Sequence, residues 1–294
     1  MKIVFFGTPE FAVESLDAII KAGHEVAAVV TATDKPAGRG HKLLPSAVKQ
    51  FALSHGLAVL QPAKLRDPEF LARLREIAAD IFVVIAFRMM PQEVWDMPPL
   101  GTFNLHASLL PRYRGAAPIN RAVMNGDSVT GVTTFMLQRE IDTGDILRQE
   151  SIEIAPDENV GSVHDRLMTL GARVTVETLA EIEAGTAAPR KQLDEDATPA
   201  PKIFKEDCKI DTSKSAEAVR NHIRGLSPYP GAWTDRLCGT TMKVLEAYHH
   251  SGAQLPGHLY LQCADGTLEL TLIQPQGKRV MPATDYLRGL RSNG

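Results

Sequence analysis

The segment FNLHASLLPRYRGAAPINRA, residues 103–122, contains the residue types and spacing best suited to chemistry. Asn104 and His106 are two positions apart, so on a β-strand both side chains project from the same face. An amide donor beside an imidazole can polarise a carbonyl and hold its developing oxyanion, which acyl or formyl transfer requires. A buried hydrogen-bonded pair with a purely structural role has the same pattern, and the two residues alone leave both interpretations open.

A second candidate group is the carboxylate pair Asp142 and Asp145 in EIDTGDIL, a glycine-containing turn between two apolar, strand-like runs. A carboxylate on a rigid turn can orient a histidine, favour its protonated form, or accept a proton from an attacking amine directly or through water. Aspartates in such turns also commonly bond to their own backbone. The segment by itself does not separate these roles.

The third candidate is the loop TATDKPAGRGHKLLPSAVK, residues 31–49. Its glycines give the backbone freedom and its arginine can form bidentate contacts, which suits an approach to phosphates and bases. A solvated surface loop has the same composition, and that alternative stays open. The charged residues of this loop are Lys35, Arg39, Lys42, Lys49 and the acid Asp34.

The elements that must position these groups begin with an alternation of β-rich and amphipathic runs over the first ninety residues. This order predicts βαβ units, hence an α/β, Rossmann-like, mostly parallel sheet with helices on both faces. Thr8 and Pro9 predict the start of the first helix and Gly23 its end. The turn GTPEF lacks G-x-G-x-x-G, which disfavours a dinucleotide and an NAD-linked oxidoreductase. The runs are KIVFFG, HEVAAVVT, LAVLQP and IFVVIAF as strands, with PEFAVESLDAIIKAG, PSAVKQFALSHG and DPEFLARLREIAAD as helices.

Further strands are predicted at GTFNLHAS, TGVTTFMLQ and ILRQESIEI, with a helix at PINRAVMNG and a long helix from about residue 160 to 184 with a potential break at Gly171. We therefore expect a catalytic domain at residues 1–188 and a Pro- and charge-rich linker at residues 189–206. Residues 207–294 contain one helix and several alternating segments, which predict a small antiparallel barrel. An OB-like fold fits its length, although the strand count equally allows an SH3-like barrel.

Composition bounds the remaining possibilities. With 294 residues, 44% of them hydrophobic, the chain can form two cores, and no run approaches the roughly 18 apolar residues that span a bilayer. We expect an unexported, cytoplasmic protein. Three distant cysteines and the lack of an H-E-x-x-H pattern predict neither disulfide nor metal. Residues 1–200 hold 20 basic and 26 acidic side chains, a net charge of −6, and residues 201–294 hold 12 and 9, a net charge of +3. We therefore expect any polyanion to bind to the C-terminal part.

The motif N-L-H-x-S-L-L-P-R-Y-R-G-A-A-P-I followed by D-T-G-D resembles the methionyl-tRNA formyltransferase family. The resemblance covers nearly the whole chain, from F-x-G-T-P-x-F through D-K-P-A-G-R-G at residues 34–40 to P-Y-P-G-A-W and Q-P-x-G-K-R. It implies an enzyme that transfers the formyl group of 10-formyltetrahydrofolate to the amino group of methionyl initiator tRNA. Separately, we expect a monomer, because the sequence has no exposed apolar helix repeats that would indicate a partner.

The resemblance also implies roles for individual residues, with Arg39 as the main contact to the tRNA acceptor end. The catalytic residues it implies are Asn104, His106 and Asp142. The folate-binding residues it implies are Phe87, Met89, Ser108, Leu109, Pro111, Arg139 and Ile141. The tRNA-binding residues it implies are Lys35, Arg39, Lys42, Lys243, Lys278 and Arg279. Phe87-Arg88 stands where many relatives carry Tyr-Gly, so Arg88 either caps the pterin pocket or extends into solvent.

Two other functions remain open. Related formyltransferases act on small amines such as a purine precursor or an amino sugar nucleotide, and the glycinamide ribonucleotide enzymes share the Asn, His and Asp trio. The basic loop and the C-terminal module oppose the purine precursor. An RNA-binding α/β protein with a decayed site is disfavoured because the trio and D-T-G-D occur together.

Overall fold

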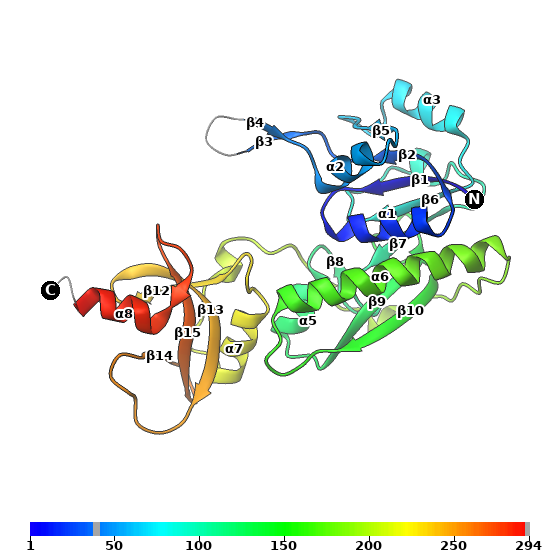
Figure 1. Cartoon of the computed structure of the whole chain (residues 1–294). Coiled ribbons are helices and arrows are strands. Elements are labelled where there is room, and N and C mark those ends of the chain that lie inside the picture. Colours follow the sequence, from blue (N-terminus) through cyan, green and yellow to red (C-terminus); the bar gives the residue numbers. More distant parts are fainter. Residues whose placement is uncertain (38–41, 292–294) are drawn as a thin grey trace. The chain divides into compact units, whose positions relative to one another are not determined.

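The computed structural model describes residues 1–37 and 42–291, and Figure 1 shows the course of the chain. The chain forms two compact units, and each is assembled from three separate segments. Unit 1 comprises Met1–Arg114, Gly131–Ile152 and Asp165–Pro199. Unit 2 comprises Gly115–Thr130, Glu153–His164 and Ala200–Gly294. The packing of each unit therefore depends on residues far apart in the sequence.

Unit 1 is built on a seven-stranded sheet with the order β10-β9-β7-β6-β1-β2-β5. The strands from β7 to β5 run parallel to their neighbours, whereas β9 is antiparallel to β7. Burial of the central strands on both faces explains their continuous apolar runs. The predicted Rossmann-like sheet is confirmed. The strands are β1 (Lys2–Gly7), β2 (Glu25–Val30), β5 (Val59–Leu60), β6 (Ile81–Ile85), β7 (Thr102–His106), β9 (Val129–Met136) and β10 (Ile146–Glu153).

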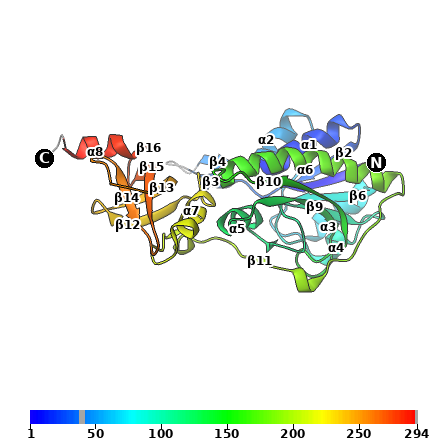
Figure 2. The ribbon, with the colours of Figure 1, turned by 90° about the horizontal axis from the view of Figure 1, so that it is seen from below.

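Helices cover both faces of this sheet. Figure 2 shows α1 (Phe11–Lys21) and α2 (Ala47–Ser54) on one side and α3 (Pro68–Ile77) and α4 (Gln92–Trp95) on the other. Alternate residues of β1, β2 and β6 form one buried cluster with α3 and α4 because side chains alternate along a strand. That cluster includes Val4, Phe6, Val30, Phe82, Val84, Phe70, Leu74 and Val94.

Local sequence signals set the helix ends. The Asp67 carboxylate accepts a hydrogen bond of 2.9 Å from the Glu69 N–H and caps α3, whose first residue is a proline. Gly23 has φ +85° directly after α1, which confirms its predicted role. The predicted start at Thr8 was wrong, because Glu10 occupies the N-cap position and α1 begins at Phe11.

The long helix α6 runs from Val160 to Glu183 without the break considered at Gly171. A Cβ atom on Gly171 would lie 2.6 Å from the Leu105 Cδ2, so the glycine allows close approach of α6 to β7. The Thr134 and Thr178 hydroxyls, 2.8 Å apart, join β9 to the same helix. Helix α6 thus covers the face of β7 that carries Leu105, opposite Asn104 and His106.

The basic loop contains a short hairpin that the sequence did not predict. Strands β3 (Lys35–Ala37) and β4 (Lys42–Leu44) pair antiparallel. The Lys49 ammonium lies 2.6 Å from the Asp34 carboxylate. This hydrogen bond, followed by one from Gln61, lowers the pKa of Asp34. The positive charge of Lys49 is therefore paired with a carboxylate of the same loop.

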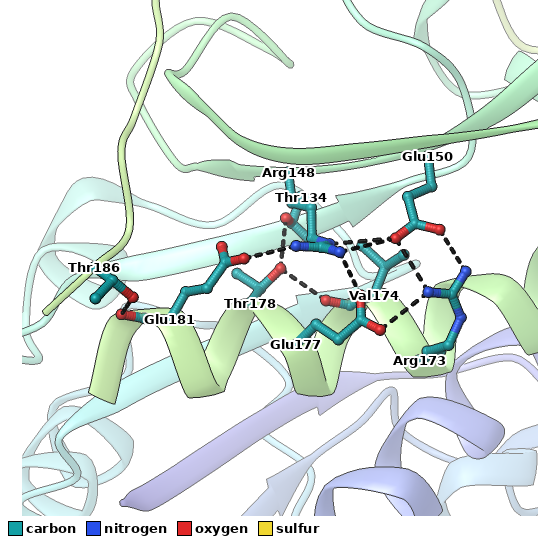
Figure 3. Close-up of polar contacts among 9 residues, drawn as sticks. All are labelled: Thr134, Arg148, Glu150, Arg173, Val174, Glu177, Thr178, Glu181 and Thr186. Atoms are coloured by element: carbon teal, nitrogen blue, oxygen red, sulfur yellow. Dashed lines mark hydrogen bonds and ion pairs between the residues drawn. The ribbon is translucent and has the colours of Figure 1, made fainter. Parts of the chain in front are cut away.

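An ion-pair network, which we call the α6 network, joins α6 to β10 (Figure 3). The Arg148 guanidinium lies 3.1 Å from Glu150, 2.8 Å from Glu177 and 2.6 Å from Glu181. Arg173 contacts both Glu150 and Glu177. The hydrogen bond from Arg173, and then that from Arg148, lowers the pKa of Glu150. Connected charges of this kind stabilise more than an isolated surface pair does.

We expect Glu150→Gln to destabilise the protein at pH 7 by about 1 kcal/mol, a loss of about 2–4 °C in Tm. The pKa of Glu150 is lowered in the folded state, so its stabilising effect is complete above the ordinary glutamate pKa and is lost as pH falls through the lowered value. Thermal melts at pH 7 and pH 3 measure this, and the difference between the two proteins should shrink at pH 3. A difference that is equal at both pH values contradicts the assignment. Glu76→Gln, which removes an exposed pair with Arg73, is the control.

Unit 2 contains a five-stranded antiparallel sheet in which β12, β13, β15 and β14 are neighbours in that order and β16 pairs with β15. The predicted small antiparallel β domain is confirmed. Its strands are β12 (Ala232–Leu237), β13 (Thr240–His250), β14 (Leu259–Gln262), β15 (Thr267–Pro275) and β16 (Met281–Pro282). Its helices are α5 (Pro118–Met124), α7 (Ala216–Arg224) and α8 (Ala283–Arg291).

The remaining elements are short and lie in the connecting segments. Strands β8 (Arg114–Gly115) and β11 (Pro199–Ala200) pair with each other, and 3₁₀ turns occur at Asp194–Asp196 and Glu206–Cys208. The predicted linker therefore contains regular structure. Among the residues described, we find no helix with the length and apolarity that crossing a membrane requires.

Candidate active site

Strand β7 places Asn104 and His106 on one face of the sheet, as predicted. Asn104 lies opposite Val84 of β6 and opposite Phe135 of β9. Its half-buried amide is thus flanked by apolar side chains, where a hydrogen bond to a developing charge is worth more than in water. Helix α6 packs on the other face of β7, against Leu105, whereas Val84 belongs to the buried cluster that α3 and α4 cover.

The imidazole of His106 is held in one orientation. Only 6% of His106 is exposed, and its Nε2 lies 2.8 Å from the Tyr113 carbonyl oxygen. A carbonyl oxygen can only accept, so Nε2 carries a proton and donates it. The Phe135 ring meets the imidazole edge to face, with centroids 6.5 Å apart. Nδ1 is therefore the ring atom whose protonation can change during a reaction.

Asp142 lies on the Nδ1 side of the imidazole. Its Oδ2 is 3.8 Å from the His106 Nδ1, a distance for charge attraction rather than a direct hydrogen bond. Asp142 has φ +55° and Tyr113 has φ +63°, a left-handed conformation that stores strain in residues other than glycine. Both partners of His106 thus lie on turns that the surrounding structure must enforce.

The D-T-G-D turn depends on its glycine. A Cβ atom on Gly144 would lie 1.6 Å from the Met136 carbonyl oxygen, so no other residue fits there without a shift of the backbone. The Met136 N–H donates to the Asp145 carbonyl at 2.9 Å and joins the turn to β9. Of the two aspartates considered from the sequence, Asp142 pairs with the imidazole.

The loop after β7 is fixed by its own hydrogen bonds. Ser108 is fully buried, and its hydroxyl donates to the Arg112 carbonyl at 2.6 Å. The Thr133 hydroxyl donates to the Ser108 carbonyl at 2.6 Å and accepts from the Leu110 N–H at 3.1 Å. Thr133 is also the strand partner of His106. Thr133 therefore pairs with the strand of the histidine through its backbone and holds the loop beyond that strand through its side chain.

The residues predicted to bind folate come from three loops. Because β6 and β7 are parallel, the loops that carry Phe87 and Leu109 leave the same end of the sheet. Phe87 is half-buried against Phe6, with ring centroids 5.6 Å apart. Met89 is 73% exposed and Ile141 is 57% exposed. These apolar groups suit the flat face of an aromatic ring system. The other predicted members are Pro111, which is half-buried, and Arg139, which is exposed.

Arg88, for which the sequence left two possibilities, is held against the protein. Its guanidinium donates to the carbonyls of Pro62 at 2.5 Å and Ala63 at 3.1 Å. The guanidinium carbon of Arg88 lies 5.7 Å from the centre of the Phe87 ring. Arg88 thus connects the loop after β6 to residues 62–63.

The residues predicted to bind tRNA are dispersed along the chain. Lys35 is exposed in β3, whereas Arg39 lies outside the described residues. The backbone of Lys42 begins β4. The Lys243 ammonium donates to the Pro230 carbonyl at 2.7 Å. Lys278 and Arg279 are exposed on the turn after β15, and the Lys278 ammonium lies 5.3 Å from the Tyr286 ring centre.

Gln192 was not found from the sequence. Its Nε2 donates to the Asp142 carbonyl at 2.9 Å and to the Gly144 carbonyl at 2.8 Å. Its Oε1 accepts two hydrogen bonds from Arg114, at 3.1 and 2.9 Å. Gln192 lies in the predicted linker, where neither periodicity nor a motif marks it. The R-Y-R-G motif contains its partner Arg114, but that motif gives no sign of a residue 78 positions away in the chain.

A surface hollow elsewhere in unit 1 includes none of the predicted site residues. It is lined by Arg66, Arg75, Gln92, Glu93, Asp96 and Met97. Over residues 1–37 and 42–291, no three His, Cys, Asp or Glu side chains are grouped as metal ligands.

Two family models and several curated relatives match this chain. The family described as "Formyl transferase" matches residues 1–179, and "Formyl transferase, C-terminal domain" matches residues 202–291. A methionyl-tRNA formyltransferase of Bacteroides thetaiotaomicron is 48% identical over an alignment of 309 positions, which covers 99% of this chain and 96% of the relative. One from Flavobacterium johnsoniae is 47% identical over 303 residues, with coverages of 99% and 96%.

Two solved structures share the fold at low identity. An N-formyltransferase from Helicobacter canadensis, in complex with folinic acid and dTDP-3-aminofucose, has a TM-score of 0.69 at 18% identity and covers 94% of this chain and 99% of its own. HypX from Aquifex aeolicus in complex with tetrahydrofolic acid has a TM-score of 0.67 at 18% identity, with coverages of 98% and 47%.

Proposed function

Because this chain belongs to the methionyl-tRNA formyltransferase family, we propose that it transfers the formyl group of 10-formyltetrahydrofolate to the free amino group of methionyl initiator tRNA. The product is N-formylmethionyl-tRNA for translation initiation. The observation that carries the proposal is the grouping of a fixed imidazole with a carboxylate 3.8 Å from its Nδ1, on the strand face that also holds the Asn104 amide. A charged tRNA as acceptor implies a cytoplasmic enzyme.

The amine attacks the formyl carbon, and a new C–N bond forms as the formyl oxygen gains negative charge. The Asn104 amide and the protonated His106 Nδ1 donate hydrogen bonds to that oxygen. These bonds are stronger in the transition state than in the ground state, which is the condition for a faster reaction. The Tyr113 carbonyl supports this by keeping Nε2 occupied.

The reaction also moves a proton. Asp142 favours the charged imidazole and accepts the proton that the attacking amine loses, directly or through water. The bond from the formyl carbon to the folate nitrogen then breaks, and that nitrogen takes up a proton to leave as tetrahydrofolate. In this reaction one C–N bond forms, one C–N bond breaks and one proton moves from the amine to the folate nitrogen, so no change of oxidation state occurs.

In this proposal residues 1–188 carry catalysis, residues 189–206 form the linker, and residues 207–294 form the tRNA-binding domain, whose contacts to the tRNA are Lys243, Lys278 and Arg279. The pterin binds against Phe87, Met89 and Ile141, whose apolar surfaces are half-buried or exposed. The same pocket includes Ser108, Leu109, Pro111 and Arg139. The tRNA is bound through Lys35, Arg39, Lys42, Lys243, Lys278 and Arg279, and the enzyme acts as a monomer.

The test is formyl transfer to methionyl initiator tRNA by the full chain, with and without 10-formyltetrahydrofolate. We expect folate-dependent formation of formylmethionyl-tRNA and no comparable rate on glycinamide ribonucleotide or on a dTDP-amino sugar. Faster transfer to the amino sugar would replace the proposed acceptor with a small amine. Folate binding without transfer to any amine would reject the catalytic proposal.

We expect Arg39→Ala to lower kcat/KM for methionyl-tRNA about tenfold, with little change in the KM for the folate. Removal of one phosphate contact should also reduce the dependence of tRNA binding on salt by about one unit of log–log slope. Steady-state kinetics at several salt concentrations measure both effects. Lys21→Ala, which removes one exposed cation from α1, is the control. Unchanged tRNA kinetics in Arg39→Ala would remove the basic loop from the proposed tRNA site.

A further inference from the structure

We propose that residues 190–198 form a strap that positions the catalytic groups, and that Gln192 is the positioning residue through which the strap holds Asp142. The inference rests on the proposed function only for its kinetic readout. The sequence marks this segment as a linker between domains, whereas its hydrogen bonds assign it to the site.

The strap is tied to the two segments that supply the partners of His106. At one end, Arg190 and Ile146 exchange two backbone hydrogen bonds of 2.8 and 2.9 Å just after the D-T-G-D turn. At the other end, the Thr198 hydroxyl accepts a hydrogen bond of 2.9 Å from the Tyr113 N–H. The backbone carbonyl of Thr198 accepts one of 2.9 Å from the Arg114 N–H. The strap therefore spans both sides of the imidazole.

Gln192 lies between these two ends and has its full hydrogen-bonding capacity in use. A primary amide offers two N–H donors and an oxygen with two acceptor sites. Both donors go to the turn, to the carbonyls of Asp142 and Gly144. Both acceptor sites receive Arg114. No other natural side chain of this length combines two donors with two acceptor sites in one planar group.

These contacts close a ring around the imidazole. Tyr113 binds Nε2, the next residue Arg114 binds Gln192, Gln192 binds the backbone of Asp142, and the Asp142 carboxylate faces Nδ1. Asp142 and Tyr113 both have positive φ, a conformation that persists only when its surroundings enforce it. The clamp on the Asp142 carbonyl is such an enforcing contact, and it acts on the residue whose carboxylate must face Nδ1.

The first test compares two variants of similar size to glutamine. Gln192→Glu keeps an acceptor for Arg114 but loses both donors to the turn, and Gln192→Met loses all four hydrogen bonds without adding charge. We expect kcat to fall about tenfold to a hundredfold in both, with each KM within about threefold, because small displacements of a catalytic group lower the rate steeply. A kcat within about twofold of wild type in both variants overturns the proposal.

Gln262→Glu is the matched control. Gln262 likewise donates to two backbone carbonyls of a turn, those of Cys263 and Gly266, and accepts from the Thr267 hydroxyl. It lies in unit 2, at the last position of β14. We expect its variant to show a comparable change in Tm and an unchanged kcat. If both glutamines had only a structural role, kcat would fall with Tm to the same extent in the Gln192 and Gln262 variants. Such a result would reject the positioning role of Gln192.

A double-mutant cycle tests the route of the effect. Because Gln192 acts through Asp142, Gln192→Met should lower kcat by less than about twofold in an Asp142→Asn background. An undiminished effect there overturns the route. Hydrogen exchange of the amides at residues 138–146 gives a readout without activity: exchange should speed up in Gln192→Met and not in Gln262→Glu. If the wild type did not formylate methionyl-tRNA, the proposed function would fail, and unchanged exchange would separately reject the strap.

Discussion

His106→Ala is expected to lower kcat about 10²- to 10³-fold, the usual effect of removing one preorganised donor to a developing oxyanion. The ring has a fixed Nε2–H bonded to the Tyr113 carbonyl and a Nδ1 3.8 Å from the Asp142 carboxylate. Its removal therefore deletes both the donor and the group whose charge Asp142 favours. KM should change little, because the loss is confined to the transition state. Steady-state kinetics on methionyl-tRNA, with circular dichroism to check folding, measure the effect.

The companion variant Asp142→Asn keeps the size of the side chain and removes its charge. We expect a loss of turnover of similar order, and the double variant His106→Ala with Asp142→Asn should be about as slow as the slower single one, because the two groups act as a unit. Losses that multiply in the double variant contradict this coupling. Normal turnover in either folded single variant rejects the catalytic assignment.

Gly144→Ala is the second change with a large expected effect. The added Cβ would lie 1.6 Å from the oxygen and 2.8 Å from the carbon of the Met136 carbonyl. Both are backbone atoms, so rotation of a side chain cannot relieve the contact and the turn must move away from β9. We expect a destabilisation of about 1–3 kcal/mol and a loss of kcat of about a hundredfold or more as Asp142 leaves its place beside His106.

Gly289→Ala is the matched control, since the Cβ of that residue would meet nothing within 4 Å in helix α8. An alanine there should leave kcat unchanged and keep or slightly raise Tm. Denaturant titration and kinetics of both variants make the comparison. A Gly144→Ala protein with wild-type turnover would mean that the D-T-G-D turn does not set the carboxylate of Asp142.

The parts of the site that lie on regular structure were predictable because strand geometry converts spacing into direction. A separation of two residues was enough to put Asn104 and His106 on one face of β7. The order of apolar runs was enough to predict the parallel sheet that supports them. The break considered at Gly171 failed for a different reason: glycine in a helix can serve close packing, here against Leu105, and a single sequence does not distinguish the two uses.

The parts that lie on irregular structure were not predictable. The Tyr113 carbonyl is a backbone atom, so the type of residue 113 gives no sign that it fixes the His106 tautomer. Gln192 is 50 residues from Asp142 in the chain, and its role depends on how two turns approach each other. Lys49 was counted among the basic side chains of its loop, but its pairing with Asp34 depends on the course of the backbone rather than on composition.

Unit 2 is built from three separate chain segments, and this constrains how the gene can recombine with a diverged relative. Its core packs Met124 of α5 beside Gly225, and the Asn120 amide donates to the Gly225 carbonyl at 2.8 Å. Arg224 donates to the Glu158 carbonyl at 3.0 Å. A crossover that exchanged only the chain beyond residue 200 between diverged parents would bring mismatched partners to these contacts. Functional chimeras should therefore inherit residues 115–130 and 153–164 from the same parent as the C-terminal segment.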